Sequence, residues 1–537
     1  MRKTEIENQA TTQNIGQGDL IMDEQTICID TSSEMAFVCH KLIPIIFLTF
    51  AVKCFLAWCF PFTGDEAYFL LCGKNIAMGY YDHPPLTGWL LNMLLLLGQS
   101  IGLMRLLPIV FSTAVGVGIY LLLRPFGRRK AYLVFLLYII SPINMAFFAV
   151  LTDAPLFLFS FFSVYFLFEA ERRNSYLFYL LSGLCLGLAF LSKYFSVLLC
   201  FSYLIYLLTS HKDSKKVKGF LLLALGVLPF IAQNTVWNYW AGWPNIMHNM
   251  VNRSTTHSSS LVNLLCLCIF LSYLITPPVL YFLLKNSAGI LRMFREDKFR
   301  LFAMVSIIPA CVFLAVSLKR AVRPHWYMSF FPFVYIMAAF LLNNAQIVKS
   351  IKFSLVFSLI QVILVIAASY APVAKLNGLI EENDLTSLVT YMRPKEVLRP
   401  LMEYEDRFVL ATTSYSRSAL FEFYSRERVI VFGKGSKHAR QDDILTNFNE
   451  LDGRNIVTLC KGTRDDSEYK QCFDRMEVKH FSVESANFTL LLGYGFKYRE
   501  YRERYLLTIL RRYYQIPDWL PGSRSFFHEK YNFQIGN

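Results

Sequence analysis

Eleven apolar runs between residues 41 and 370 constrain the fold of this chain more than any other feature. A helix needs about 20 mostly apolar residues to cross the hydrocarbon core of a bilayer, and several runs approach that length. Apolar residues make up 55% of the chain and charged residues only 17%, which is typical of a membrane protein. We therefore expect an α-helical polytopic membrane protein of about 11–13 spans. The runs are 41–60, 103–123, 131–149, 154–170, 176–191, 194–209, 218–237, 261–284, 301–317, 325–342 and 351–370, and a further helix at 87–98 would add another.

Basic residues are distributed unevenly between the loops that connect these runs. Alternate loops hold most of the lysines and arginines, whereas the loops between them hold few. Because positively charged loops stay on the cytoplasmic side of a membrane, we predict that the basic set is cytoplasmic. The segment beyond residue 371 then lies on the opposite side. The basic loops are 124–130, 172–173, 212–218, 285–300 and 349–352.

The two ends of the chain lack the membrane pattern. Residues 1–36 are polar and net acidic and have no basic region before the first run, which predicts a disordered cytoplasmic tail and no cleaved signal peptide. Residues 37–370 would form the transmembrane domain, with a large first external loop at 61–102. In the remainder, RFVLAT, SYSRSALFEFYS, RVIVFG and NIVTLC read as strand, helix, strand and strand. We therefore expect a soluble, extracytoplasmic α/β domain at 371–537.

Several common kinds of binding site are not indicated. The basic residues form no single patch with interleaved aromatics, so we expect no nucleic-acid partner. No glycine-rich phosphate loop or dinucleotide fingerprint precedes a helix, which argues against a soluble nucleotide-sugar donor. We expect no metal and no cofactor, because the histidines, carboxylates and cysteines lack ligand spacing. Cys460 and Cys472 fall in the soluble segment, and whether they form a disulfide is open.

Ionisable residues gather at the predicted outer ends of the spans. Asp65 and Glu66 form an acid pair after the first run, and His83 follows, fixed before two prolines. Asp153 and Lys193 end later runs on the same side. Their convergence beneath a soluble domain suggests an enzyme that acts on a lipid anion.

Each of these residues also has a purely structural explanation. Asp153 or Thr152 could cap the following helix, and Lys193 could extend its amine to the membrane interface. Trp243 could belong to the aromatic belt that membrane proteins place at the bilayer surface.

An ordered set of motifs resembles the bacterial branch of the protein O-mannosyltransferase family. These motifs are DEAYFLL, GYYDHPPLTGWL, SPINMAFFAVLTDAPLFLF, GLAFLSKYFSVLL, NTVWNYWAGWPNIMHNMVNR and VRPHWYMSFFPF, across roughly residues 40–340. The family belongs to the C-type membrane glycosyltransferases and is similar to the lipid A aminoarabinose transferases. The resemblance implies a catalytic transmembrane domain that transfers one sugar from a polyprenyl-phosphate carrier.

The resemblance also implies roles for particular residues. Asp65 occupies the first position of the family's catalytic acid pair, with Glu66 beside it, and a carboxylate there can take the proton of an attacking hydroxyl. Asp153 matches the second external acid and would orient the acceptor or the donor sugar. The departing phosphate needs cations, and the candidates are His83, Lys193, Arg105 and Arg323. The substrate-binding candidates are Tyr68, Tyr81, Asp82, Trp243 and His325.

The chain departs from the aminoarabinose transferases at His83, where they carry a lysine. A histidine is only partly charged at neutral pH unless a carboxylate such as Asp82 holds its proton.

The implied enzyme is an inverting glycosyltransferase in the bacterial inner membrane, with its active site on the periplasmic face. Its acceptor would be lipid A or lipopolysaccharide, another glycan or a protein, and the sugar and the acceptor stay open. The alternative function is a transporter or flippase of lipid-linked sugars, for which repeats or midplane charges would be expected.

Overall fold

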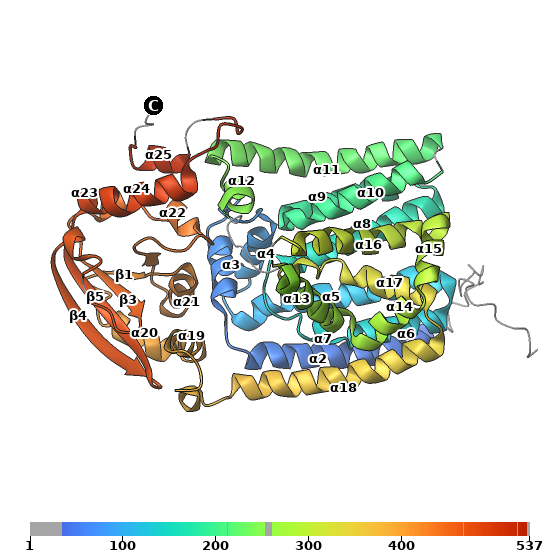
Figure 1. The fold of residues 1–537 in the computed structure, drawn as a ribbon, viewed down its shortest axis with the longest axis horizontal. Helices are drawn as coiled ribbons and strands as arrows, with labels where there is room; N and C mark the ends of the chain where they lie inside the picture. Colours follow the sequence, from blue (N-terminus) through green and yellow to red (C-terminus); the bar gives the residue numbers. More distant parts are fainter. Residues whose placement is uncertain are drawn as a thin grey trace, which may run out of the picture.

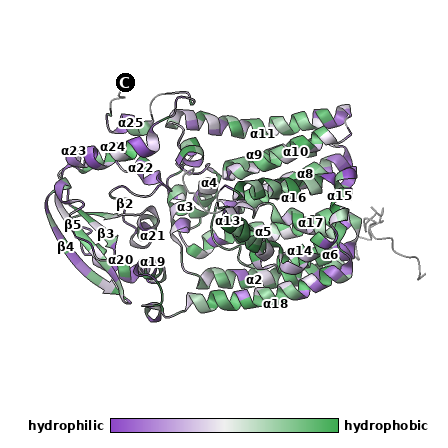
Figure 2. Ribbon diagram, viewed as in Figure 1, coloured by the Kyte–Doolittle hydropathy of each residue, from purple (hydrophilic) through white to green (hydrophobic). Residues whose placement is uncertain are grey.

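The computed structural model of the protein describes residues 35–211, 213–252, 260–319, 321–465, 467–522 and 525–533. A bundle of long helices lies against a mixed α/β domain formed by the last third of the chain (Figure 1). Hydrophobic residues run along the bundle, and hydrophilic residues gather in the α/β domain and at the far end near α15 (Ser287–Arg295) (Figure 2). Residues 1–34 of the predicted tail lie outside the described residues.

Six helices in the described ranges are long and apolar enough to cross a membrane. A further pair, α13 (Ser260–Ile275) and α14 (Pro277–Lys285), passes the same test together but bends by 100° at the break. The protein is therefore a multi-pass membrane protein with six candidate spans, or seven if the bent pair is one span. The six are Met35–Cys59, which contains α2 (Ile43–Cys59), together with α5 (Ile101–Leu123), α8 (Asp153–Arg173), α11 (Ser214–Ala241), α16 (Asp297–Ser317) and α18 (Asn344–Ser369).

The other predicted runs are helical but shorter than a span or broken. In the run 131–149, Ser141 caps a new helix that has Pro142 at its first position, so α6 (Arg128–Ile139) ends and α7 (Pro142–Met145) begins. In the run 261–284, Thr276 has a φ of 69° and precedes two prolines, which separates α13 from α14. The short helices are α4 (Leu86–Leu95), α9 (Tyr176–Ser192), α10 (Val197–Thr209) and α17 (Phe331–Leu341).

The predicted first external loop, 61–102, is largely helical. It contains α3 (Gly64–Lys74) and α4, which pack against each other at the end of the bundle nearest the α/β domain (Figure 1). Thr63 begins α3 with a capping box, in which its hydroxyl accepts from the Glu66 amide and the Glu66 carboxylate accepts from the Thr63 amide. The capping box therefore fixes where the acid pair enters the helix.

The α/β domain contains a five-stranded sheet in the order β2-β1-β3-β5-β4. Strands β1 (Val409–Thr412), β2 (Val429–Val431) and β3 (Ile456–Lys461) are parallel and lie where the sequence predicted strands. Strands β4 (Phe473–Val483) and β5 (Ala486–Phe496) form an antiparallel hairpin that the sequence did not indicate. Cys460 and Cys472 are both buried free thiols, so the structure contains no disulfide between them.

Helices cover both faces of this sheet. Val457 and Leu459 of β3 share a core with Leu385 and Val389 of α19 (Glu382–Met392), whereas Ile456 of β3 faces the opposite core. The remaining helices of the domain are α20 (Pro394–Met402), α21 (Tyr415–Ser425), α22 (Gln441–Leu445), α23 (Tyr498–Tyr501), α24 (Leu507–Ile509) and α25 (Phe526–Lys530).

Helix α21 joins the α/β domain to the bundle by packing against α3. Gly64, the first residue of α3, lies so close to Ser416 that a Cβ atom on Gly64 would be 2.5 Å from the Ser416 Cβ. Ala67 shares an apolar cluster with Leu420, and the Phe62 and Phe423 rings lie 4.7 Å apart. Two helix starts, one from each part of the molecule, therefore meet at a glycine.

We expect Gly64→Ala to loosen the α/β domain from the bundle, because the added methyl group has no space beside Ser416. Overpacking of this kind costs about 1–3 kcal/mol. Thermal unfolding in detergent and limited proteolysis of the 371–408 segment would both detect the change. Gly102→Ala is the matched control, because a Cβ at Gly102 meets no atom within 4 Å. Equal unfolding midpoints and cleavage rates for the two variants would contradict the importance of this contact.

Candidate active site

Glu66 and Arg105 form a fully buried ion pair at the start of α3. The guanidinium donates to both carboxylate oxygens, from Nε at 2.8 Å and from Nη2 at 2.6 Å, and neither side chain is exposed. Its remaining N–H groups donate to the carbonyls of Ala57, Phe60 and Pro61 at 2.6–2.8 Å. All five donors of Arg105 are engaged. Arg105 therefore lies in a saturated ion pair, and its contact with a phosphate stays a prediction.

The Glu66 carboxylate is equally occupied. Besides Arg105, it accepts from the amide and hydroxyl of Thr63 and from the amide of Val150 at 3.0–3.1 Å. Glu66 thus joins α5, the start of α3 and the segment before α8. This geometry gives Glu66 a structural position beside the catalytic candidate Asp65.

Asp65 faces the α/β domain. Its Oδ1 atom accepts a hydrogen bond of 2.8 Å from the hydroxyl of Tyr415, the first residue of α21. Burial, followed by the charge of Asp65, raises the pKa of Tyr415 far above its usual value, so this phenol remains a donor. Nothing in the sequence indicated Tyr415, because its partner lies 350 residues away.

Asp82 lies at the centre of a second polar group. It accepts a hydrogen bond of 2.7 Å from Tyr68, and its other oxygen is 3.5 Å from Nε2 of His83. Burial opposes ionisation of Asp82, but His83, His248 and the Tyr68 hydrogen bond together lower its pKa. The Tyr68 and Tyr415 rings are 5.4 Å apart in an edge contact, so this group adjoins that of Asp65.

Asp153 pairs with Lys193. The Lys193 amine donates to both carboxylate oxygens at 2.8 and 2.9 Å, and Asp153 is almost fully buried as the first residue of α8. Neither structural explanation from the sequence describes this arrangement fully, because the Thr152 side chain makes no capping hydrogen bond and Lys193 is held by a carboxylate. Lys193 also lies 5.3 Å from the Phe195 ring.

A cavity of about 290 Å³ brings Asp82, His83 and Lys193 together. Apolar side chains, mostly from α10 and α16, also line it. They include Phe195, Val197, Leu198, Val312, Phe313, Val316 and, from the turn Pro324–Trp326, Trp326. The cavity therefore combines basic and apolar side chains in one lining.

A second cavity, of about 480 Å³, has Asp65 in its wall. It lies between the ends of α2 and α18, the start of α3 and the helices α19 and α21. None of the described residues that line it is a lysine, arginine or histidine. The two cavities are thus chemically different, and the Tyr415–Tyr68 contact lies between Asp65 and Asp82.

The structure places the other predicted site residues apart from these cavities. Tyr81 is fully buried against Tyr514 of the α/β domain, and its amide donates to Gln441 at 3.0 Å. The Trp243 indole donates to the Pro521 carbonyl at 2.7 Å. Both residues hold the two parts of the molecule together. Arg323 and His325 flank the short turn at Pro324–Trp326, and neither lines the 290 Å³ cavity, although Trp326 does.

The sequence analysis also missed His248. This buried ring lies 5.6 Å from Tyr81 and 5.4 Å from His438 of the α/β domain, and its charge acts on Asp82. In the described part of the chain, no group of three or more histidine, cysteine or acidic side chains could hold a metal ion.

A comparison with known families matches part of the chain. Residues 82–237 match the family model described as dolichyl-phosphate-mannose-protein mannosyltransferase. This part of the chain is therefore similar to a family of membrane glycosyltransferases. No curated protein sequence matches the chain.

Solved structures show the same fold. ArnT from Cupriavidus metallidurans bound to undecaprenyl phosphate is 15% identical and gives a TM-score of 0.56, covering 86% of this chain and 98% of that chain. Its apo state gives 0.57 at 14% identity with the same coverage. The Pmt1-Pmt2 complex of S. cerevisiae bound to the sugar donor is 20% identical over 42% of this chain and 38% of that chain, with a TM-score of 0.32. The ArnT fold therefore extends over most of the protein.

We expect Glu66→Gln to destabilise the protein, because it leaves the Arg105 charge buried without a counterion. Breaking a buried pair in this way costs about 3–5 kcal/mol. The yield of folded protein and its unfolding midpoint in detergent would report the loss. Glu396→Gln is the control, because its carboxylate is 60% exposed and lies 3.8 Å from Arg393. A stable Glu66→Gln protein without transfer activity would instead support the catalytic role expected from the sequence.

Proposed function

We propose that the protein transfers a sugar from a polyprenyl-phosphate donor to a hydroxyl group of an acceptor, with inversion at the anomeric carbon. The observation that carries this proposal is the 290 Å³ cavity, whose lining includes both the basic side chains of Lys193 and His83 and a set of apolar side chains. A polyprenyl phosphate has the same two parts, an anionic head and a long hydrocarbon chain. The isoprenoid would lie along α10 and α16, and its phosphate would contact Lys193 and His83.

Lys193 is the better placed of the two cations. Asp153 holds its amine through two oxygens, at 2.8 and 2.9 Å, and Lys193 lines the cavity beside His83. The sugar–phosphate bond breaks in the reaction, and the phosphate leaves with an additional negative charge. A cation in a poorly hydrated site stabilises that charge as it develops. Asp153 would keep Lys193 charged and oriented for this purpose.

Asp65 is the proposed general base. The acceptor oxygen attacks the anomeric carbon while its proton passes to the Asp65 carboxylate. Tyr415 donates to one oxygen of Asp65 and leaves the other to accept this proton. The cavity beside Asp65 has no cationic lining residue, which favours a neutral hydroxyl at the point of attack over a phosphate. Lipid A, other glycans and proteins all carry such hydroxyls.

The reaction would take place on the periplasmic face of the bacterial inner membrane. The basic loops predicted to be cytoplasmic include the start of α6 and all of α15, and both helices lie at the end of the bundle away from the α/β domain (Figure 1). The positive-inside rule therefore puts the α/β domain and both cavities outside. A reporter fused after residue 371 that is active only in the cytoplasm would contradict this orientation.

The transporter alternative has less support. Lys53 is an ionisable residue inside a candidate span, but its amine donates to Ser112 and Asn144 at 2.9 Å and lies in neither cavity. Its position is explained by the contacts it makes between α2, α5 and α7.

We expect Lys193→Gln to lower transfer by about 10²-fold and to raise the KM for the donor, because one phosphate-stabilising cation is lost. Lys193→Arg should retain part of the activity. Radiolabelled transfer from a panel of polyprenyl-phosphate sugars to membrane acceptors would measure both. Lys375→Gln, an exposed change in the segment leading to the α/β domain, is the control. Wild-type kinetics for Lys193→Gln would remove this residue from the donor site.

We expect Asp65→Asn to reduce turnover by about 10²-fold or more while the protein still inserts and folds, since the side chain keeps its shape but loses its basicity. Tyr415→Phe should have a smaller effect, because the carboxylate remains. The same transfer assay, corrected for folded protein in the membrane, would compare them with Asp406→Asn, an exposed acid of the α/β domain. Near-normal turnover of Asp65→Asn would point to a phosphate acceptor, which is already ionised.

A further inference from the structure

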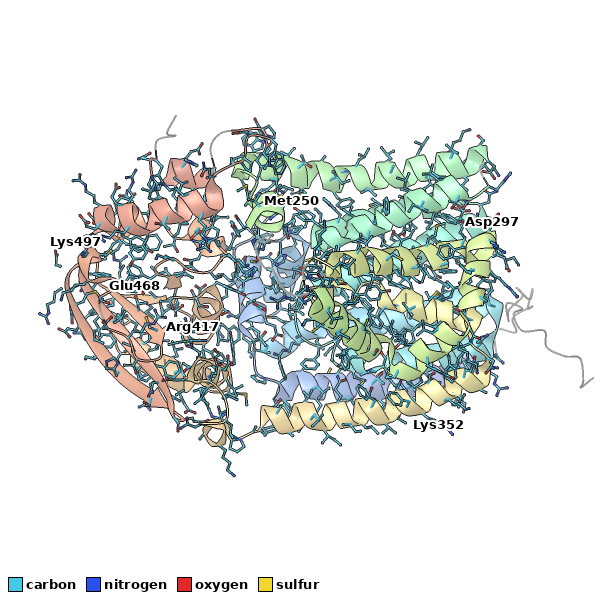
Figure 3. All side chains as sticks on the ribbon, viewed as in Figure 1. Met250, Asp297, Lys352, Arg417, Glu468 and Lys497 are labelled. Carbon is cyan, nitrogen blue, oxygen red and sulfur yellow. The ribbon has the colours of Figure 1, made fainter. Side chains whose placement is uncertain are left out.

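A buried arginine in the α/β domain has donors without partners. Arg417, in the first turn of α21, is only 5% exposed. One guanidinium nitrogen, Nη2, donates to the Thr413 hydroxyl at 2.8 Å, whereas Nε and Nη1 are buried and have no hydrogen-bond partner in the described part of the chain. Unpaired buried donors of a charged group are costly, so native proteins usually satisfy them. Figure 3 shows Arg417 between the sheet and the bundle.

The fold brings this arginine to the edge of the sheet where α/β proteins bind ligands. The parallel strands stand in the order β2-β1-β3, so the chain leaves β1 toward one side and later returns to the other. The sheet edge at the carboxyl ends of β1 and β3 is therefore a topological switch point, where α/β proteins commonly bind ligands. Thr413 follows β1 directly, and Cys460 near the end of β3 lies within electrostatic range of Arg417.

Further positive charge lies at the same sheet edge. Helix α21 starts there, and the Ser414 side chain at its N-cap makes no capping hydrogen bond. The N-terminus of a helix attracts anions through its free amides and its dipole. Lys461, the last residue of β3, and Arg464 are close enough for their charges to interact with that of Arg417.

The groups around Arg417 do not supply a matching anion. Burial raises the pKa of the Cys460 thiol to about 11, so the thiol is uncharged at neutral pH. Asp384 acts on Lys461, whose amine also donates to the Ser387 hydroxyl, and Glu468 pairs with Arg464 at 3.5 Å. Neither of these two carboxylates forms an ion pair or hydrogen bond with Arg417. Burial lowers the pKa of Arg417 only to about 10, so the guanidinium stays charged.

We propose that the sheet edge at the carboxyl ends of β1 and β3 binds an oxyanion, a phosphate or a carboxylate, between the Arg417 guanidinium and the start of α21, with Lys461 and Arg464 nearby. Tyr415 and Ser416, the two residues before Arg417, line the cavity beside Asp65. We assign the oxyanion to the acceptor, and this assignment rests on the proposed function, whereas the anion site itself does not. An acidic glycan would be held at Arg417 while a neutral hydroxyl reaches Asp65.

The anion site can be tested with inorganic phosphate on the full-length protein in detergent. At constant ionic strength, phosphate should raise the unfolding midpoint of the wild type saturably, whereas chloride should not. Arg417→Gln should remove this response and, in chloride alone, should be at least as stable as the wild type because an unpaired buried charge is gone. Arg399→Gln, an exposed arginine of α20, should respond like the wild type. An absent wild-type response, or an equal one in Arg417→Gln, would overturn the site.

The assignment to the acceptor has its own test. Phosphate should inhibit sugar transfer competitively with the acceptor, and Arg417→Gln should raise the acceptor KM about 10-fold while the donor KM stays unchanged. Lys461→Gln should raise it less. If phosphate stabilises the protein but the acceptor KM is the same in Arg417→Gln, the oxyanion is not part of the acceptor. If the wild type transfers no sugar from any polyprenyl phosphate, the proposed function fails although phosphate still binds.

Discussion

The Arg105–Glu66 pair fixes the part of the molecule on which both cavities depend. Arg105 comes from a long bundle helix, and its five donors hold three carbonyls at the end of α2 and the carboxylate at the start of α3. Glu66 in turn holds the segment before α8 through the Val150 amide. Asp65 precedes Glu66 directly, and Asp153 lies three residues beyond Val150. A single saturated ion pair thus sets the positions of Asp65 and Asp153, and neither of these acids takes part in the pair.

The sequence predicted the architecture well wherever one local pattern decided it. Long apolar runs gave helices, and alternating or continuous apolar segments gave β1, β2 and β3. The prediction of uninterrupted spans failed where a helix-start signal falls inside an apolar run. Ser141-Pro142 and Thr276-Pro277 are helix starts inside apolar runs, so the uninterrupted spans expected there are broken. The β4–β5 hairpin was missed because strand β4 exposes many polar side chains, which weakens its apolar pattern.

The site was predicted in part for a similar reason. Motifs gave the residue types, and the structure brings His83, Asp82 and Lys193 to one cavity. Motifs could not separate roles within an acid pair, because Asp65 and Glu66 differ only in which neighbour each one meets. They also could not reveal Tyr415 or His248, whose partners are distant in sequence, or Arg417, whose burial is known only from the fold. Such contacts follow from the packing of α21 and of the α/β domain on α3, which no local pattern encodes.

The hydrogen bond between Tyr415 and Asp65 spans most of the polypeptide. Asp65 is synthesised early and Tyr415 only after every candidate span in the described residues. Asp65 consequently cannot acquire this partner before α21 has been made. A nascent chain that stops short of α21 would contain Asp65, Lys193 and the residues that line the 290 Å³ cavity but would lack Tyr415. The order of synthesis therefore makes this hydrogen bond between the bundle and the α/β domain a late contact in folding.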